Sequence, residues 1–181
     1  MDTMILRMPA VALRGMVILP GMIAHFDVSR EKSIKAVEES MMDEQKIFLV
    51  AQKDVEQEEP GIDDLYKIGV IAEIKQVIKL QNNIVRILVE GKERAELSAF
   101  LENPGYLMAE IIRFEEEDHD GLSEDEKAAM VRSLQETFGK YSTVNQKLGK
   151  DLFRQLNEVK DLERLMENMG NNLPVRYEEK Q

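Results

Sequence analysis

The periodicity of the apolar residues changes once along this 181-residue chain, at the acidic run 115–121. Before that run, short apolar segments have the length and alternation of β-strands. After it, apolar residues recur every three or four positions, as in helices. A run of like charges that ends in glycine is typical of a solvated connector. We therefore predict an α+β chain with a β-rich part at 1–114, an acidic connector at 115–122 and a helical part at 123–181.

Within the β-rich part, two turn sequences predict hairpins. Gln81-Asn82-Asn83 and Asn103-Pro104-Gly105 each separate a pair of β-branched, apolar runs. A helix is expected to begin after an N-cap at Ser29, because Ile34, Val37 and Met41 follow at helical spacing. The expected strands are 13–19, 47–51, 69–80, 84–90, 95–101 and 106–114, with 47–51 buried on both faces. Several strands closed by hairpins predict a barrel or a curled sheet.

The helical part begins with a capping box, Ser123-Glu-Asp-Glu126. Three helical patterns follow, in which the apolar residues run from 128 to 141, from 152 to 159 and from 162 to 169. Gly170-Asn171-Asn172 is expected to end the third helix, with Pro174 beyond it. The polar end at 176–181 permits a helix and carries no stop signal, so we expect the chain to be truncated there.

Composition excludes several classes of protein. The net charge is −11, and no lysine or arginine stripe offers the phosphate contacts that nucleic-acid binding requires. No signal-peptide pattern or membrane-spanning run is visible, and the chain has no cysteine. We expect a cytoplasmic protein that binds neither membranes nor nucleic acid.

Nucleotide binding is not predicted either. Gly-Lys pairs occur at Gly91, Gly139 and Gly149, but each lacks the earlier glycine and the hydroxyl residue of a phosphate-binding loop. The sequence therefore predicts no cofactor.

Three groups of residues are candidates for catalytic or metal sites. Ser29 and Lys32 match a Ser-x-x-Lys pattern without its companion motifs, so an N-cap role for Ser29 is favoured. His119 lies in the acidic run, where a solvated connector is favoured over a cation site. His25 and Asp27 offer an acid/base pair, but a structural imidazole at a strand-to-helix junction is favoured. We predict no catalytic residue and no metal site.

The most unusual local feature is a turn that carries apolar residues on its far side. Pro20-Gly21 is ordinary turn chemistry, but Met22 and Ile23 follow it directly. Large apolar side chains at a turn either pack inward or bind something. Pro20, Met22 and Ile23 are therefore the candidate binding site, whereas Met41 and Met166 are expected to fill core gaps.

The order of motifs resembles the N-terminal domain of bacterial Lon ATP-dependent proteases. The resemblance is carried by LRGMVILPGM (13–22), FDVSREKS (26–33), IFLVAQKD (47–54), DDLYKIG (63–69), VRILVEG (85–91) with Arg94-Ala95, and NLPVRYEEKQ (172–181). It implies a PUA-like β subdomain followed by a helical bundle. In the family an ATPase module and a Ser-Lys protease domain come later and are absent from this sequence, so no catalytic role carries over to these residues.

The resemblance leaves two functions open. In the first, the domain recognises unfolded or damaged polypeptides through exposed apolar surface and supports assembly of a homo-oligomer, a hexamer in the parent protein. In the second, it is mainly a self-association domain without direct substrate contact. The isolated chain is compatible with a dimer or a monomer.

Overall fold

The computed structural model describes residues 5–101, 105–114, 121–145 and 150–181. Contacts divide the chain into two compact units, one from Met1 to Glu115 together with Tyr177–Gln181, and one from Glu116 to Arg176. The last five residues thus pack with the first unit, although the sequence groups them with the helical part. That each part is an independent domain stays a prediction.

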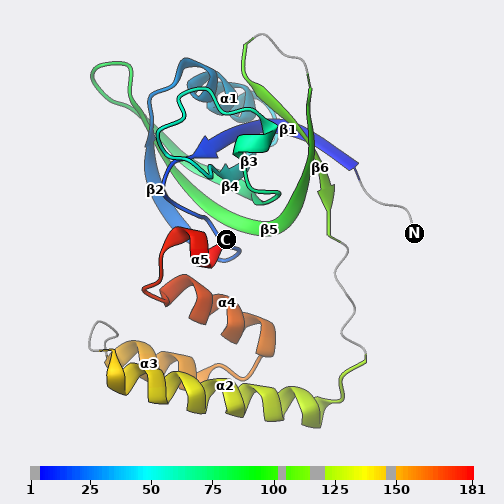
Figure 1. The fold of residues 1–181 in the computed structure, drawn as a ribbon, viewed down its shortest axis with the longest axis vertical. Helices are drawn as coiled ribbons and strands as arrows, with labels where there is room; N and C mark the ends of the chain where they lie inside the picture. The colour runs from blue at the N-terminus through cyan, green and yellow to red at the C-terminus, as the bar shows by residue number, and fades with distance from the viewer. Residues whose placement is uncertain (1–4, 102–104, 115–120, 146–149) are drawn as a thin grey trace. The chain divides into compact units, whose positions relative to one another are not determined.

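Six strands form one curled sheet in the first unit (Figure 1). They are β1 (Ile5–Leu13), β2 (Ile23–Val28), β3 (Lys46–Ala51), β4 (Ile68–Lys79), β5 (Val85–Leu101) and β6 (Leu107–Arg113). The strand order is β2-β5-β4-β3-β1-β6, and β5 also pairs with β6. This last pairing closes five strands into a ring and leaves β2 outside it, on the edge of β5. The predicted α+β class and curled sheet are confirmed.

Strand β5 is longer than the sequence suggests. Two strands, 84–90 and 95–101, were predicted, but one strand of 17 residues covers both. Gly91, Glu93 and Arg94 continue the antiparallel ladder with β4, opposite Ala72, Ile71 and Val70. Register shifts mark bulges along two of the three ladders of β5, those with β4 and β6. Bulges bend a strand, and this bending allows β5 to pair with β4 and β6 in the ring and also with β2 outside it.

Strand β1 lies earlier than predicted. The apolar run 13–19 was interpreted as a strand, but β1 ends at Leu13 and the chain continues as a loop. Gly15 has φ 63°, which a β-strand does not accommodate. Val17 and Ile18 are nevertheless buried, so their hydrophobicity reflects a packed loop.

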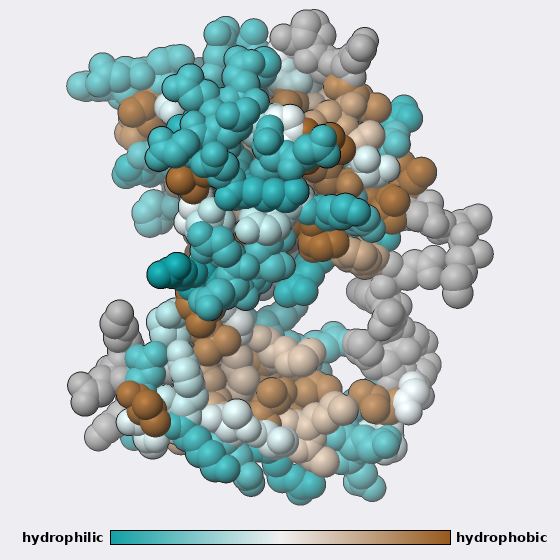
Figure 2. All heavy atoms as spheres, in the orientation of Figure 1, coloured by the Kyte–Doolittle hydropathy of each residue, from teal (hydrophilic) through white to brown (hydrophobic). Residues whose placement is uncertain are grey.

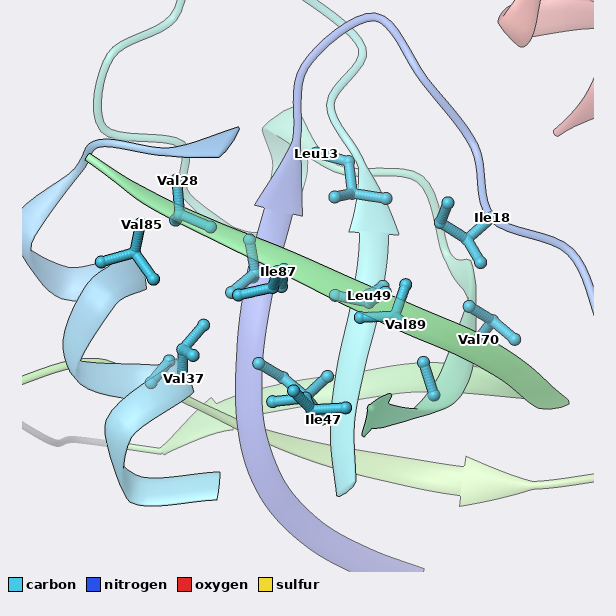
Figure 3. Packing of buried hydrophobic residues seen from close by; sticks show 14 of the residues in the cluster. Leu13, Ile18, Val28, Val37, Ile47, Leu49, Val70, Val85, Ile87 and Val89 are labelled. Carbon is cyan, nitrogen blue, oxygen red and sulfur yellow. The ribbon is translucent and has the colours of Figure 1, made fainter. Parts of the chain in front are cut away.

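Two apolar clusters fill the first unit. One draws on all five strands of the ring and includes Met8, Phe48 and Ala109. The other lies on the opposite side of β1 and β3, beneath helix α1 (Glu31–Met42) and the first half of β5 (Figure 3). Strand β3 contributes to both clusters, which confirms that it is buried on both faces.

Helix α1 departs from the prediction at both ends. Its N-cap is Arg30 rather than Ser29, and no side chain caps it. Met41 was expected in the core, but 37% of it is exposed. It lies near the C-terminal end of α1, one turn beyond the buried Val37, where the helix has run past the core.

The described part of the second unit contains three helices, α2 (Glu124–Val144), α3 (Lys150–Glu158) and α4 (Leu162–Asn172). The capping box at Ser123 and Glu126 is confirmed. Their shared core is Val131, Phe138, Leu156, Leu165 and Met169.

Helix α4 ends within the predicted stop Gly170-Asn171-Asn172, but the prediction for Met166 is wrong. The helix continues through Gly170 to Asn172. Its C-cap is Leu173, whose backbone N–H donates a hydrogen bond to the carbonyl of Met169. Met166 is 49% exposed because Leu165 and Met169 take the buried face.

The short helix α5 (Tyr177–Lys180) belongs to the first unit, where Gln181 Nε2 donates to the carbonyl of Ile68 at 2.6 Å. A single turn of 3₁₀ helix, Ile62–Asp64, precedes β4. The predictions for Asn103-Pro104, for His119 and for most of the acidic connector lie outside the described residues.

Candidate functional site

The apolar turn between β1 and β2 has a defined geometry. Met22 N donates to the carbonyl of Leu19 at 3.1 Å, and Gly21 has φ 72°. A type II turn favours proline at its second position and requires a residue with positive φ, usually glycine, at its third position. Gly21 N then donates to Gly91 O, and Gly91 N donates to Met22 O, both at 2.9 Å, which is the hydrogen-bond pattern of a G1 bulge. The turn is therefore fastened to β5.

The three predicted binding residues differ in exposure. Pro20 is buried, and Met22 is half-buried against the cluster beneath α1. Ile23 is 67% exposed at the start of β2. Of the three, Ile23 alone presents most of its surface to solvent, because alternate residues of a strand point to opposite faces.

Ile23 opens onto the outer face of β2, β5 and β4. On that face His25 lies opposite Leu88, and Leu88 lies opposite Gln76. Ile78, 43% exposed, occupies the next row of β4. A hollow of about 270 Å³ is lined by His25, Gln76, Ile78, Arg86 and Leu88. We call the apolar residues Ile23, Leu88 and Ile78 the outer patch.

Sequence reasoning missed Leu88 and Ile78. A signal was present, because Val77 and Ile78 are consecutive apolar residues in a strand and must face opposite sides.

Figure 2 shows apolar side chains exposed also on the helical unit, over α4.

Ion pairs flank the outer patch at both ends. At one end Arg86 Nε and Nη2 donate to the two carboxylate oxygens of Asp27, at 2.6 and 2.8 Å. The bond from Arg86 holds the pKa of Asp27 below its usual value. At the other end four side chains form a network, with Lys75–Glu73 at 2.8 Å, Lys75–Glu90 at 2.9 Å and Lys92–Glu90 at 2.6 Å. The charges are thus paired among themselves, although Arg86 and Asp27 share the row of Ile78, and Glu90 lies opposite Ile23.

The histidine predictions change accordingly. Asp27 is engaged by Arg86, so it does not form an acid/base pair with His25. His25 lies within β2, exposed, and not at a strand-to-helix junction as predicted.

Neither the Ser29 hydroxyl nor the Lys32 side chain makes a hydrogen bond to a described residue, and Lys32 Nζ lies 3.7 Å from Glu59. Among the described residues, no three acidic or imidazole side chains gather as a metal site would require. No described helix is long and apolar enough to cross a bilayer.

An exposed apolar patch on a sheet, with its neighbouring charges paired among themselves, is typical of a protein-binding module. Residues 7–181 match the family model of the ATP-dependent protease La (LON) substrate-binding domain. The chain belongs to this family. The match covers nearly all of the 181 residues.

Relatives support the assignment over the whole chain. The Lon protease of Lachnoclostridium phytofermentans is 45% identical over 175 residues, and Lon protease 1 of Bacillus subtilis is 34% identical over 173 residues. These alignments cover 97% and 96% of this chain, which spans only 22% of each relative's length.

Solved structures show the same fold. The N-terminal domain of a Mycobacterium avium complex Lon protease has a TM-score of 0.73 at 19% identity, covering 96% of this chain and 87% of that one. A Lon N-terminal domain protein from Xanthomonas campestris has a TM-score of 0.53 at 15% identity, covering 93% of this chain and 99% of that one.

Proposed function

We propose that this substrate-binding domain recognises unfolded or damaged polypeptides through the outer patch. The observation that carries the proposal is the 67% exposure of Ile23 on a strand whose neighbours supply Leu88 and Ile78. Apolar contact is non-directional, so such a surface accepts many sequences. Unfolded chains expose the apolar side chains that folded proteins bury, and this gives selectivity for the unfolded state.

We further propose that Pro20 and Met22 act as anchors, which hold Ile23 in place without contacting substrate. Both are at least half-buried, and the turn is bonded to Gly91. Replacing Met22 should therefore reduce stability before it reduces affinity, whereas replacing Ile23 should do the reverse.

The test is the affinity of Ile23→Ser for a permanently unfolded, reduced and alkylated protein, measured by fluorescence anisotropy. Burial of an isoleucine contributes about 1.5–3 kcal/mol, so binding should weaken about tenfold or more. The matched control is Ile5→Ser, since Ile5 is also a strand residue of the first unit and is 56% exposed. Equal affinities for Ile23→Ser, Ile5→Ser and the unaltered chain, with unchanged melting temperatures, would refute the role of the outer patch.

A second function, self-association, is favoured by the edge of β2. Hydrogen-bonded and non-bonded pairs alternate along an antiparallel ladder, and the Met22–Gly91 pair is bonded. The backbone N–H and C=O groups of Ile23, His25 and Asp27 consequently point away from β5. Within the described residues β2 pairs with β5 alone, so these groups have no ladder partner. A second copy could pair there, and this contact would contribute to the homo-oligomer of a cytoplasmic protease, a hexamer in the parent protein.

Sedimentation velocity over a range of concentrations distinguishes the two functions. His25→Pro removes an outward N–H while leaving the bonds to β5 in place, because proline is tolerated at sheet edges. A dimer that disappears in this variant supports edge pairing. A chain that stays monomeric at every concentration and still binds unfolded protein contradicts it.

A further inference from the structure

Helix α1 begins without a cap. Its N-cap residue, Arg30, makes no side-chain hydrogen bond to the helix. The first helical bond that involves it runs from Ile34 N to Arg30 O, at 2.9 Å. The backbone N–H groups of Glu31, Lys32 and Ser33 have no partner in the part of the chain that the structure describes. Free N–H groups and the helix dipole make such an end attractive to anions.

The side chain of Ser33 gives a second, independent indication. Ser33 is only 3% exposed and its hydroxyl makes no hydrogen bond to any described residue, but its oxygen is not among the fully buried atoms that lack a partner, so it reaches the edge of a hollow. Ser33 lines two adjoining hollows, of about 110 and 440 Å³. Its unused donor therefore borders a space that a ligand can enter.

Two guanidinium groups line the same two hollows. Arg30 Nη2 donates to Gln52 Oε1 at 2.5 Å and to the carbonyl of Gln57 at 3.1 Å, but its Nε is buried without an acceptor. Arg14 makes no described ion pair or side-chain hydrogen bond. Burial lowers the pKa of Arg30, and the positive charge of Arg14 lowers it further, so two like charges face each other here.

Three of the four acidic side chains that line these hollows are engaged in ion pairs. Asp27 pairs with Arg86, Glu31 with Lys35 at 3.6 Å, and Glu59 with Lys32 at 3.7 Å. Glu58 has no ion pair in the described residues, and it acts on Arg30 as an opposite charge. Arg14 and Arg30 carry two positive charges and Glu58 carries one negative charge, so one positive charge is left unbalanced.

We propose that the N-terminus of α1, with Ser33, Arg14 and Arg30, binds a small oxyanion. The hydroxyl, the three N–H groups and the guanidinium donors are complementary to the oxygens of a carboxylate or a phosphate. Two kinds of ligand carry such an oxyanion: a polypeptide, through its C-terminal carboxylate, and free phosphate. The site uses binding groups other than the outer patch and does not depend on it.

The test is a titration of the isotope-labelled 181-residue chain with inorganic phosphate, followed by amide NMR shifts. The amides of Glu31, Lys32 and Ser33 should shift together and saturate. Arg14→Gln and Ser33→Ala should each weaken binding about tenfold, the usual value of a hydrogen bond to a charged group. Glu58→Gln should tighten binding, because it removes the competing negative charge. Arg132→Gln, an exposed change of equal charge in α2, is the control and should leave affinity unchanged.

Ser33→Ala separates binding from a structural role. Since the hydroxyl has no partner, its removal should leave the melting temperature equal or higher while phosphate binding falls. A second titration compares one peptide with a free and with an amidated C-terminus. If the peptide with a free C-terminus binds more strongly than the amidated peptide, and Arg14→Gln abolishes this difference, the ligand is the polypeptide carboxylate. If both peptides bind equally and phosphate still shifts the α1 amides, the ligand is phosphate. Absence of saturable shifts at α1 with phosphate and with both peptides overturns the proposal.

Discussion

Replacing Gly91 with alanine tests the contact that fastens the apolar turn to the sheet. A Cβ at this position would overlap the carbonyl oxygen of Leu19 and lie 3.2 Å from Ile18 Cγ2. Gly91 does not have a positive φ, so alanine brings no backbone strain and the collision is the whole perturbation. The loop must move outward, and this movement weakens the two 2.9 Å bonds that join Gly91 to Gly21 and Met22.

The size of the effect follows from these contacts. Overpacking costs about 1–3 kcal/mol and each weakened hydrogen bond about 1 kcal/mol, so Gly91→Ala should lower the free energy of unfolding by about 3 kcal/mol. Urea unfolding followed by far-ultraviolet circular dichroism measures this, and peroxide oxidation of Met22 should become faster. Gly121→Ala is the matched control, because nothing lies within 4 Å of its Cβ position. A loss below about 0.5 kcal/mol, with Met22 still protected, would refute the argument.

Three further predictions concern other parts of the chain. Ser123→Ala removes the capping box with Glu126 and should cost about 1 kcal/mol in urea unfolding, whereas Ser123→Asp, which can still cap the helix, should cost less. Leu165→Ala empties the centre of the helical core, where Leu165 is fully buried, and should cost about 2–5 kcal/mol; the amides of α2 and α4 should exchange faster while those of β3 stay protected. The bond from Arg86 lowers the pKa of Asp27, so its stabilising contribution is complete at neutral pH and disappears as the pH falls through the lowered pKa, below about 4. Asp27→Asn should therefore be less stable than the unaltered chain near neutral pH and equal to it near pH 2, and a difference independent of pH would contradict the pairing.

Local patterns predicted the elements whose hydrogen bonds are local. The capping box at Ser123 lies within one helical turn, and the β4–β5 hairpin closes over three residues, so both follow from adjacent sequence. The interruption predicted at Gly91 was wrong because β4 supplies the ladder from a distant segment. The apolar run 13–19 was misassigned for a similar reason, since burial by the rest of the fold, and not pairing, accounts for Val17 and Ile18.

The binding surfaces were less predictable than the fold. Ile23 could be found because it follows a turn, but the outer patch exists only once register places Leu88 beside β2 and Ile78 in the neighbouring row. The oxyanion site is still less visible, because Arg14 and Arg30 are separated by a turn and a strand. Neither residue belongs to a motif, and their proximity is a product of topology.

The position of β2 separates the proposed binding surface from the closure of the sheet. The ring of five strands closes through β5 and β6, so β2 is not needed for closure. Its inward residues, Ala24 and Phe26, pack on the core, whereas Ile23 and His25 face away from it. Stability and the proposed binding are therefore assigned to alternate residues of the same strand. Substitutions at the outward positions should change affinity with little change in melting temperature, and substitutions at the inward positions should lower the melting temperature first.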